Sequence, residues 1–195
     1  MTLKAIEKRE YILNKAKDVF IHMGFNNVTM KDIIETCEIS RGGVYLYFSS
    51  VGEIFEEVVK RHNKIKNDEL KHSIEQNMDF NLLIDTFFSG QRDRLLKMDR
   101  SLFAAMNEYC FSNKSKSVED FYNEQYANAK EMFLEILRFG KKENAIKAEN
   151  IELLADSIMF LIEGLRSLFS STTISEKMAD EQIHICKKMI FSDLF

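Results

Sequence analysis

The 195-residue chain contains no proline. Proline lacks a backbone N–H and its ring blocks the preceding turn, so helix interiors exclude it, whereas turns use it freely. Glycine is also scarce, with 7 residues, although an all-β fold of this length would need many turn residues of both kinds. These counts predict an all-α fold.

Apolar residues recur at helical spacing along nearly the whole chain. Short gaps separate the segments, as is usual between helices packed antiparallel in a bundle. The predicted helices cover residues 3–23, 30–36, 41–46, 51–76, 80–97, 99–112, 117–140, 148–170 and 175–193. Because the helices are short before residue 50 and long after it, we expect two functional units, residues 1–50 and residues 51–195.

Charge and cysteine content narrow the class of protein. The net charge of −4 argues against a generally basic protein that coats nucleic acid. Cys37, Cys110 and Cys186 lie far apart, which is typical of neither a disulfide framework nor a zinc site and fits a reducing cytoplasm. The charged N-terminus does not resemble a signal peptide, and no apolar run approaches the ~20 residues that span a bilayer. We therefore expect a cytoplasmic protein without a membrane partner.

Residues 29–48 read T-M-K-D-I-I-E-T-C-E-I-S-R-G-G-V-Y-L-Y-F. Thr29 and Ser40 are good N-caps, and Asp32 falls in the first turn after Thr29, close to a capping box. The segment therefore predicts two short helices joined by a three-residue turn. This is the helix-turn-helix layout, in which the second helix enters the major groove of DNA.

The exposed face of such a second helix must carry small or hydrogen-bonding residues, and this one begins with Ser40, Arg41, Gly42 and Gly43. Tyr45 and Tyr47 place hydroxyls where phosphates would lie, and the helix N-termini at Thr29 and Ser50 offer free amide N–H groups. Taken singly, the tyrosines could be core aromatics, the arginine a solvated charge and the hydroxyl residues plain caps. Their joint spacing favours DNA contacts.

A longer pattern surrounds this segment. R-x-x-I-L-x-x-A-x-x-x-F-x-x-x-G-F runs from Arg9 to Phe25 and continues through Thr29, Asp32-Ile33 and S-R-G-G-V-Y-L-Y-F. With this spacing, residues 9–54 resemble the DNA-binding domain of the TetR family of transcriptional repressors. The resemblance implies an all-α homodimer that binds a palindromic operator in double-stranded DNA through three-helix domains and releases it when a helical body binds a small effector.

Carried over residue by residue, the resemblance implies phosphate contacts for Thr29 and Lys31. It implies base contacts for residues 40–43 and backbone contacts for Tyr45 and Tyr47. The chain departs from the family at Val51, where lysine is usual, and at Gly52, where an acidic residue is common. Loss of the lysine predicts weaker non-specific DNA binding.

The body is rich in aromatic and polarisable side chains between residues 80 and 140. Pockets between helices are apolar with a few polar groups, so these residues are candidates for an effector pocket: Phe87, Phe88, Gln91, Phe103, Met106, Asn107, Tyr109, Tyr122, Tyr126 and Phe133. We expect an apolar or amphipathic effector, and a cation stacked on the aromatic faces would also fit. An ordinary core would contain the same residue types.

The last two predicted helices each carry a broad apolar stripe. Packed against their copies in a second subunit, they would form a four-helix interface, for which the candidates are Ile158, Ile162, Leu165, Phe169, Ile183, Cys186 and Ile190. Gly164 would let a partner helix approach closely. Alternatively, these stripes face the interior of their own subunit.

Two other classes of protein remain open. Glu69/His72 and Glu181/His184 are both Glu-x-x-His pairs, which ferritin-like di-iron enzymes use as ligands. Glu69 lies in a charged run, however, and ligand carboxylates must face inward. No catalytic triad or Gly-rich phosphate loop is present, so we expect no enzyme activity, cofactor or metal. A helical adaptor that binds only protein is the second alternative.

Overall fold

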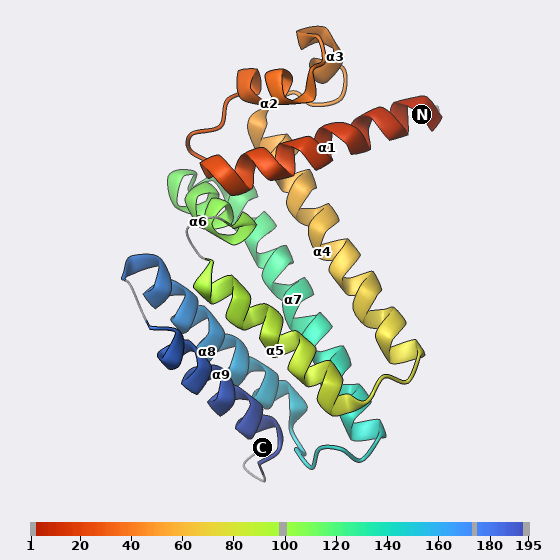
Figure 1. Ribbon diagram of the computed structural model, residues 1–195, viewed down its shortest axis with the longest axis vertical. Helices are drawn as coiled ribbons and strands as arrows, with labels where there is room; N and C mark the ends of the chain where they lie inside the picture. Colours follow the sequence, from red (N-terminus) through yellow and green to blue (C-terminus); the bar gives the residue numbers. More distant parts are fainter. Residues whose placement is uncertain (1–2, 98–100, 173–174, 193–195) are drawn as a thin grey trace. The chain divides into compact units, whose positions relative to one another are not determined.

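The computed structural model describes residues 3–97, 101–172 and 175–192 (Figure 1). Within these ranges all regular elements are helices, which confirms the all-α prediction. They are α1 (Leu3–Met23), α2 (Met30–Cys37), α3 (Arg41–Tyr45), α4 (Val51–Glu75), α5 (Phe80–Leu96), α6 (Leu102–Ser112), α7 (Lys116–Lys142), α8 (Ile151–Ser171) and α9 (Glu176–Ile190).

Polar N-caps determine where several helices begin. Ser101, Asn150 and Ser175 each accept a hydrogen bond from the backbone N–H three residues further on. Each cap satisfies one of the N–H groups that the first turn of a helix leaves unpaired. Helices α6, α8 and α9 therefore begin at residues 102, 151 and 176, rather than at 99, 148 and 175 as apolar spacing predicts.

The chain forms two compact units, and α4 and α7 each contribute to both. The first unit holds the chain up to Lys64 together with the stretch from α6 to Asn123. The second holds Ile65 through α5 and the chain from Glu124 onward. The compact units do not follow the functional division expected after residue 50, because the start of α4 and all of α6 share a core with α1 to α3. That functional division stays a prediction.

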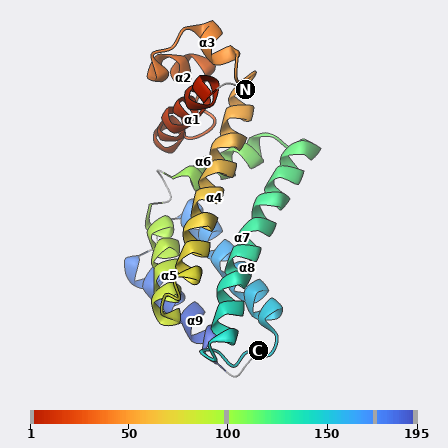
Figure 2. The ribbon, with the colours of Figure 1, turned by 90° about the vertical axis from the view of Figure 1, so that its right-hand side faces the viewer.

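Helices α2 and α3 of the first unit lie on the same side of α1 (Figures 1 and 2). The core between them is aromatic at its centre, where the rings of Phe20 and Phe55 meet edge to face at 4.9 Å. Phe25 and Tyr109 of α6 meet in the same way at 4.6 Å. Burying each such ring stabilises the fold by roughly 1.5–3 kcal/mol, so this cluster stabilises the packing of α1, α4 and α6 in the first unit.

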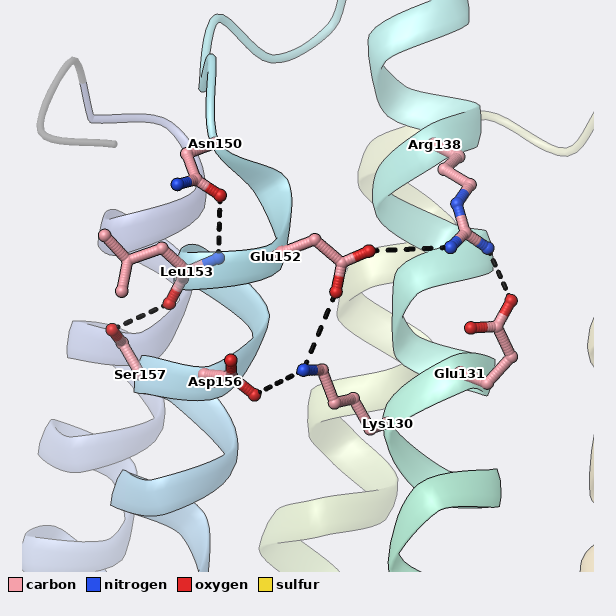
Figure 3. A network of polar contacts seen from close by, with 8 residues as sticks. All are labelled: Lys130, Glu131, Arg138, Asn150, Glu152, Leu153, Asp156 and Ser157. Atoms are coloured by element: carbon pink, nitrogen blue, oxygen red, sulfur yellow. Dashed lines mark hydrogen bonds and ion pairs between the residues drawn. The ribbon is translucent and has the colours of Figure 1, made fainter.

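Helices α5, α7, α8 and α9 build the core of the second unit, where α5 packs against both α8 and α9. Ion pairs join α7 to α8 on its surface (Figure 3). Lys130 Nζ lies 2.6 Å from Asp156 and 3.6 Å from Glu152, and Arg138 lies 3.7 Å from the same Glu152. Exposed pairs contribute little singly, but this network fixes the register of the two helices.

Two further findings bear on the sequence predictions. All three cysteines carry free thiols. Among the described residues, none of the helices combines the length and apolar character that crossing a membrane requires.

Candidate nucleic-acid interface

Helix α2 begins at a complete capping box. The Thr29 hydroxyl accepts a hydrogen bond from the Asp32 N–H, and the Asp32 carboxylate accepts from the Thr29 N–H at 2.8 Å and from its hydroxyl at 2.6 Å. These hydrogen bonds from Thr29 hold the pKa of Asp32 below its ordinary value. Aspartate therefore takes the place that glutamate usually fills in this motif. Thr29 and Lys31 are both exposed beside this cap.

The turn between α2 and α3 is fixed by backbone and side-chain contacts. Glu38 adopts the left-handed conformation with φ of 53°, and its N–H donates to the Glu35 carbonyl. A non-glycine residue pays about 1–2 kcal/mol for this conformation, so the turn is held by the surrounding packing. The Tyr11 hydroxyl of α1 contributes by donating to the Cys37 carbonyl at 3.2 Å. These contacts set the direction in which α3 leaves the turn.

The two glycines of α3 lie in different surroundings. A Cβ atom at Gly43 would lie 2.6 Å from a methyl carbon of Ile39, so the turn itself requires glycine there. A Cβ atom at Gly42 would have no atom within 4 Å. Nothing in the described chain explains a second glycine in this helix, where it costs about 1 kcal/mol relative to alanine. Gly42 instead leaves room at the exposed surface of α3.

Exposed side chains surround that open position. The Arg41 guanidinium lies over the Tyr45 ring, 5.4 Å from its centroid, and Tyr45 is 41% exposed. Tyr47 is half-buried against the core. Leu46 is 77% exposed, and sequence reasoning missed it. Leu46 lies two residues after Val44 and two before Phe48, both of which are buried, and this spacing indicates that its own side chain faces outward. An exposed leucine directly after α3 is suited to contact a thymine methyl group.

The start of α4 lies directly after α3 in the chain. The Ser50 hydroxyl accepts from the Glu53 N–H at 3.1 Å, while the Glu53 carboxylate accepts from the Ser49 N–H and hydroxyl at 2.7 and 2.6 Å. These bonds from Ser49 lower the pKa of Glu53. Val51, at the position of the family's usual lysine, is half-buried against the core of the first unit.

The residues expected to form an effector pocket divide between the two units. In the first unit, Met106 and Tyr109 are core residues, and the Tyr109 hydroxyl donates to Glu56 at 2.6 Å. Burial, reinforced by Glu56, raises the pKa of Tyr109. Phe103, Asn107 and Tyr122 of the same unit are half-buried.

In the second unit, Phe87, Phe88 and Phe133 form one aromatic cluster, in which Phe87 stacks on Phe133 at 4.8 Å. Gln91 is buried and accepts a hydrogen bond from Arg166, and Tyr126 is half-buried. Sequence reasoning missed Arg166 and its neighbour Arg94, because it looked for aromatic residues and weighed charges only as surface features.

The described residues expected at a dimer interface lie inside the core of their own unit. Ile158, Ile162, Leu165, Ile183, Cys186 and Ile190 are all buried; the side chain of Phe169 lies outside the described residues. A side chain buried in its own subunit has little surface left for a partner to cover. The apolar residues that α8 still exposes lie on its opposite face, among them Leu153, Phe160 and Leu168, with Gly164 beside them.

The Glu-x-x-His pairs do not face inward. Glu69, His72, Glu181 and His184 are exposed, and Glu69 forms an ion pair with Lys66 at 2.7 Å. No group of three or more His, Cys, Asp or Glu residues in the described ranges is placed to hold a metal ion. These described residues therefore lack the inward-facing arrangement of ligands that a di-iron site needs.

A short capped helix follows a fixed turn and exposes a small-residue face, which is the arrangement found in helix-turn-helix proteins that bind DNA. Residues 12–58 match the family model described as "Bacterial regulatory proteins, tetR family". Over 54 residues the chain is 48% identical to the uncharacterised HTH-type transcriptional regulator YfiR of Bacillus subtilis, an alignment that spans 28% of this chain and only 26% of YfiR.

Two further relatives extend beyond this segment. The HTH-type transcriptional repressor BepR of Brucella suis is 22% identical over 83% of this chain and 79% of its own length. A Saccharomonospora viridis protein, described as a transcriptional regulator and solved in complex with choline, has the same fold, with a TM-score of 0.74, 20% identity and coverage of 96% and 97% of the two chains. Residues 12–58 thus match the DNA-binding segment of the TetR family, and over most of its length the chain is similar to transcriptional regulators of that kind.

Proposed function

We propose that this protein is a TetR-type repressor that binds a palindromic operator as a homodimer and releases it when a small effector binds. The observation that carries the proposal is Gly42, because an open glycine on an exposed helix costs stability and leaves room for DNA. The match of residues 12–58 to the TetR family and the similarity to the repressor BepR support the same conclusion.

In this proposal α3 lies in the major groove. Ser40, Arg41, Gly42 and Gly43 face base edges, where arginine is suited to bind guanine through two hydrogen bonds. Thr29, Lys31, Tyr45, Tyr47 and Ser50 contact phosphates and fix the register of the helix on the duplex. The Arg41–Tyr45 contact holds the guanidinium at the exposed surface before DNA binds.

The homodimer forms through the exposed face of α8. Leu153, Phe160, Gly164 and Leu168 recur at three- to four-residue multiples and share one side of the helix, and Phe160 is 72% exposed. A Cβ atom at Gly164 would also have no atom within 4 Å, so this position allows a partner helix to approach closely. Met178 and Ile185 extend the apolar surface onto α9, which packs beside α8.

The effector acts by favouring the conformation of the dimer that fits the operator poorly. Helix α4 contributes to both units and so provides a continuous connection between them. An effector shifts the balance only by its differential affinity for the two conformations, and a tenfold loss of DNA affinity needs about 1.4 kcal/mol.

Selection of bound duplexes from a random pool, at a stated salt concentration, tests the proposal. A palindromic consensus with half-sites about one helical turn apart is the expected result. Failure to enrich any duplex, with binding that does not depend on salt, would instead favour the protein-binding adaptor.

A further inference from the structure

Arg94 and Arg166 lie near each other in the second unit. Arg166 of α8 forms an ion pair with Glu163, and its other terminal nitrogen donates to Gln91 Oε1 at 2.8 Å. Both partners of this hydrogen bond are withdrawn from water, since the Arg166 side chain is 13% exposed and Gln91 is 5% exposed. Gln91 and Glu163 therefore hold the Arg166 guanidinium in one place.

Arg94 lies one turn after Gln91 on α5, and its Nε donates to the Gly90 carbonyl at 2.9 Å. Of the arginines described in this unit, Arg94 is the one whose side-chain nitrogens have no carboxylate oxygen within 4.0 Å. Burial and the nearby Arg166 together lower the pKa of Arg94 to about 10. A partly buried guanidinium without a counter-ion destabilises a protein, so such a group points to an anion that binds there.

Several other cations of this unit are already paired with carboxylates. Arg92 contacts Asp180 and Glu176, Lys130 contacts Asp156, and Lys187 contacts Asp85 (Figure 3 shows the Lys130 pair). These carboxylates neutralise other cations and are not available to Arg94.

An aromatic surface adjoins the two arginines. Phe87 is one turn before Gln91 on the same face of α5, since residues four apart lie above one another on a helix. Its ring is half-buried and stacks on Phe133 of α7 with an interplanar angle of 17°. The face of α5 thus changes from apolar at Phe87 to cationic at Arg94 within two turns.

We propose that Arg94, with Arg166 and Gln91, binds the carboxylate of a small amphipathic acid whose apolar part lies against the exposed part of Phe87. This inference rests on the proposed ligand response and names the chemical class of the effector. Arginine suits a carboxylate because its planar donors match the two oxygens. A quaternary ammonium ion such as choline, the ligand of the Saccharomonospora protein, would meet two positive charges here.

Calorimetry and thermal unfolding of the full chain without DNA test the proposal with octanoate and benzoate as probes. Octanol, benzyl alcohol, choline and inorganic phosphate are the comparison compounds. The acids are expected to bind and to raise the melting temperature, while the alcohols and choline do not. If the alcohols bind as tightly as the acids, or choline binds, the carboxylate assignment is wrong. If phosphate binds as tightly as the acids, the apolar half of the site is wrong.

Variants separate the site from a structural role. Arg94→Gln should weaken octanoate binding at least tenfold, Arg94→Lys should weaken it less, and Arg92→Gln, on the neighbouring ion-paired arginine, should leave it unchanged. Without ligand, Arg94→Gln should be at least as stable as the wild type, because it removes an unpaired buried charge. A lower melting temperature for unliganded Arg94→Gln, or equal octanoate affinity, would overturn the proposal.

A DNA arm distinguishes this inference from the proposed function. If octanoate binds but the affinity for the operator does not change, the anion site stands and the proposed ligand response is wrong. If the protein binds the operator but none of the acids, the proposed DNA-binding function stands and the anion site is wrong.

Discussion

Gly42 and Gly43 are adjacent in α3, but only one of them is required by the fold. The methyl group of Ile39 occupies the space beside Gly43, whereas the space beside Gly42 is open. Sequence reasoning attributes both glycines to the approach of DNA. The structure gives Gly43 a second reason, its close packing against Ile39 of the turn, whereas no contact in the described chain requires Gly42.

Alanine at each position separates the two roles. Gly42→Ala should stabilise the free protein by up to about 1 kcal/mol, since alanine favours the helix, and should weaken operator binding. Gly43→Ala should be less stable than Gly42→Ala by about 1–3 kcal/mol, because the added carbon overpacks the turn. Chemical denaturation and operator titration measure both effects. Equal stability of the two variants would contradict these assignments.

Substitutions at Arg41 and Tyr47 should have different effects on DNA binding. Arg41→Ala is expected to lose about 1–3 kcal/mol of discrimination at particular base pairs, since its guanidinium reads base edges. Tyr47→Phe, the control for a backbone contact, should weaken operator and random duplexes by a similar factor. Titrations against both duplexes measure the ratio. If Arg41→Ala lowers both affinities equally, Arg41 contacts phosphate and not bases.

The sequence predicts where each helix lies along the chain better than it predicts which face of the helix is buried. Apolar spacing predicts all nine described helices to within three residues, and cap residues such as Asn150 account for the shifted starts. The direction of a side chain depends on which neighbour covers it, and that is a tertiary property. For this reason the described residues of the predicted stripe of α8, which include Ile158, are buried in their own subunit, whereas the exposed Phe160 lies outside that stripe.

The first residue of α4 gives a prediction at the same scale. Val51→Lys adds a cation beside a helix N-terminus that follows the proposed reading helix. We expect tighter binding at raised salt and a salt slope steeper by about one unit, because one more phosphate contact releases one more counter-ion. Titrations at several salt concentrations measure this slope. An unchanged slope would show that α4 begins away from the phosphate backbone.

At the scale of the molecule, the helix-turn-helix was predictable because its turn, caps and glycines are local in sequence. The proposed anion site was not, because Arg94 and Arg166 lie 72 positions apart in the chain, and only the folded structure shows that Arg94 has no carboxylate beside it. The proposed dimer face could not be predicted either, since only the packing shows which side of α8 is left exposed.

A charge on that face should separate the subunits. Phe160→Glu is expected to shift the protein from dimer to monomer in sedimentation velocity, because a dimer would bury an unpaired carboxylate. Leu82→Glu, on the similarly exposed Leu82 of α5, is the matched control and should leave the dimer intact. A Phe160→Glu dimer as stable as the wild type would place the interface elsewhere.

The most direct test of the repressor account is the affinity of the wild-type protein for a selected operator whose half-sites are moved apart by about half a helical turn, ~5 base pairs. The insertion turns the second half-site to the opposite side of the duplex while leaving every base within each half-site unchanged. The account predicts that affinity falls at least tenfold and returns toward its original value when a full turn is inserted. Affinity that does not depend on the spacing would contradict a dimer that presents two copies of α3 to one operator.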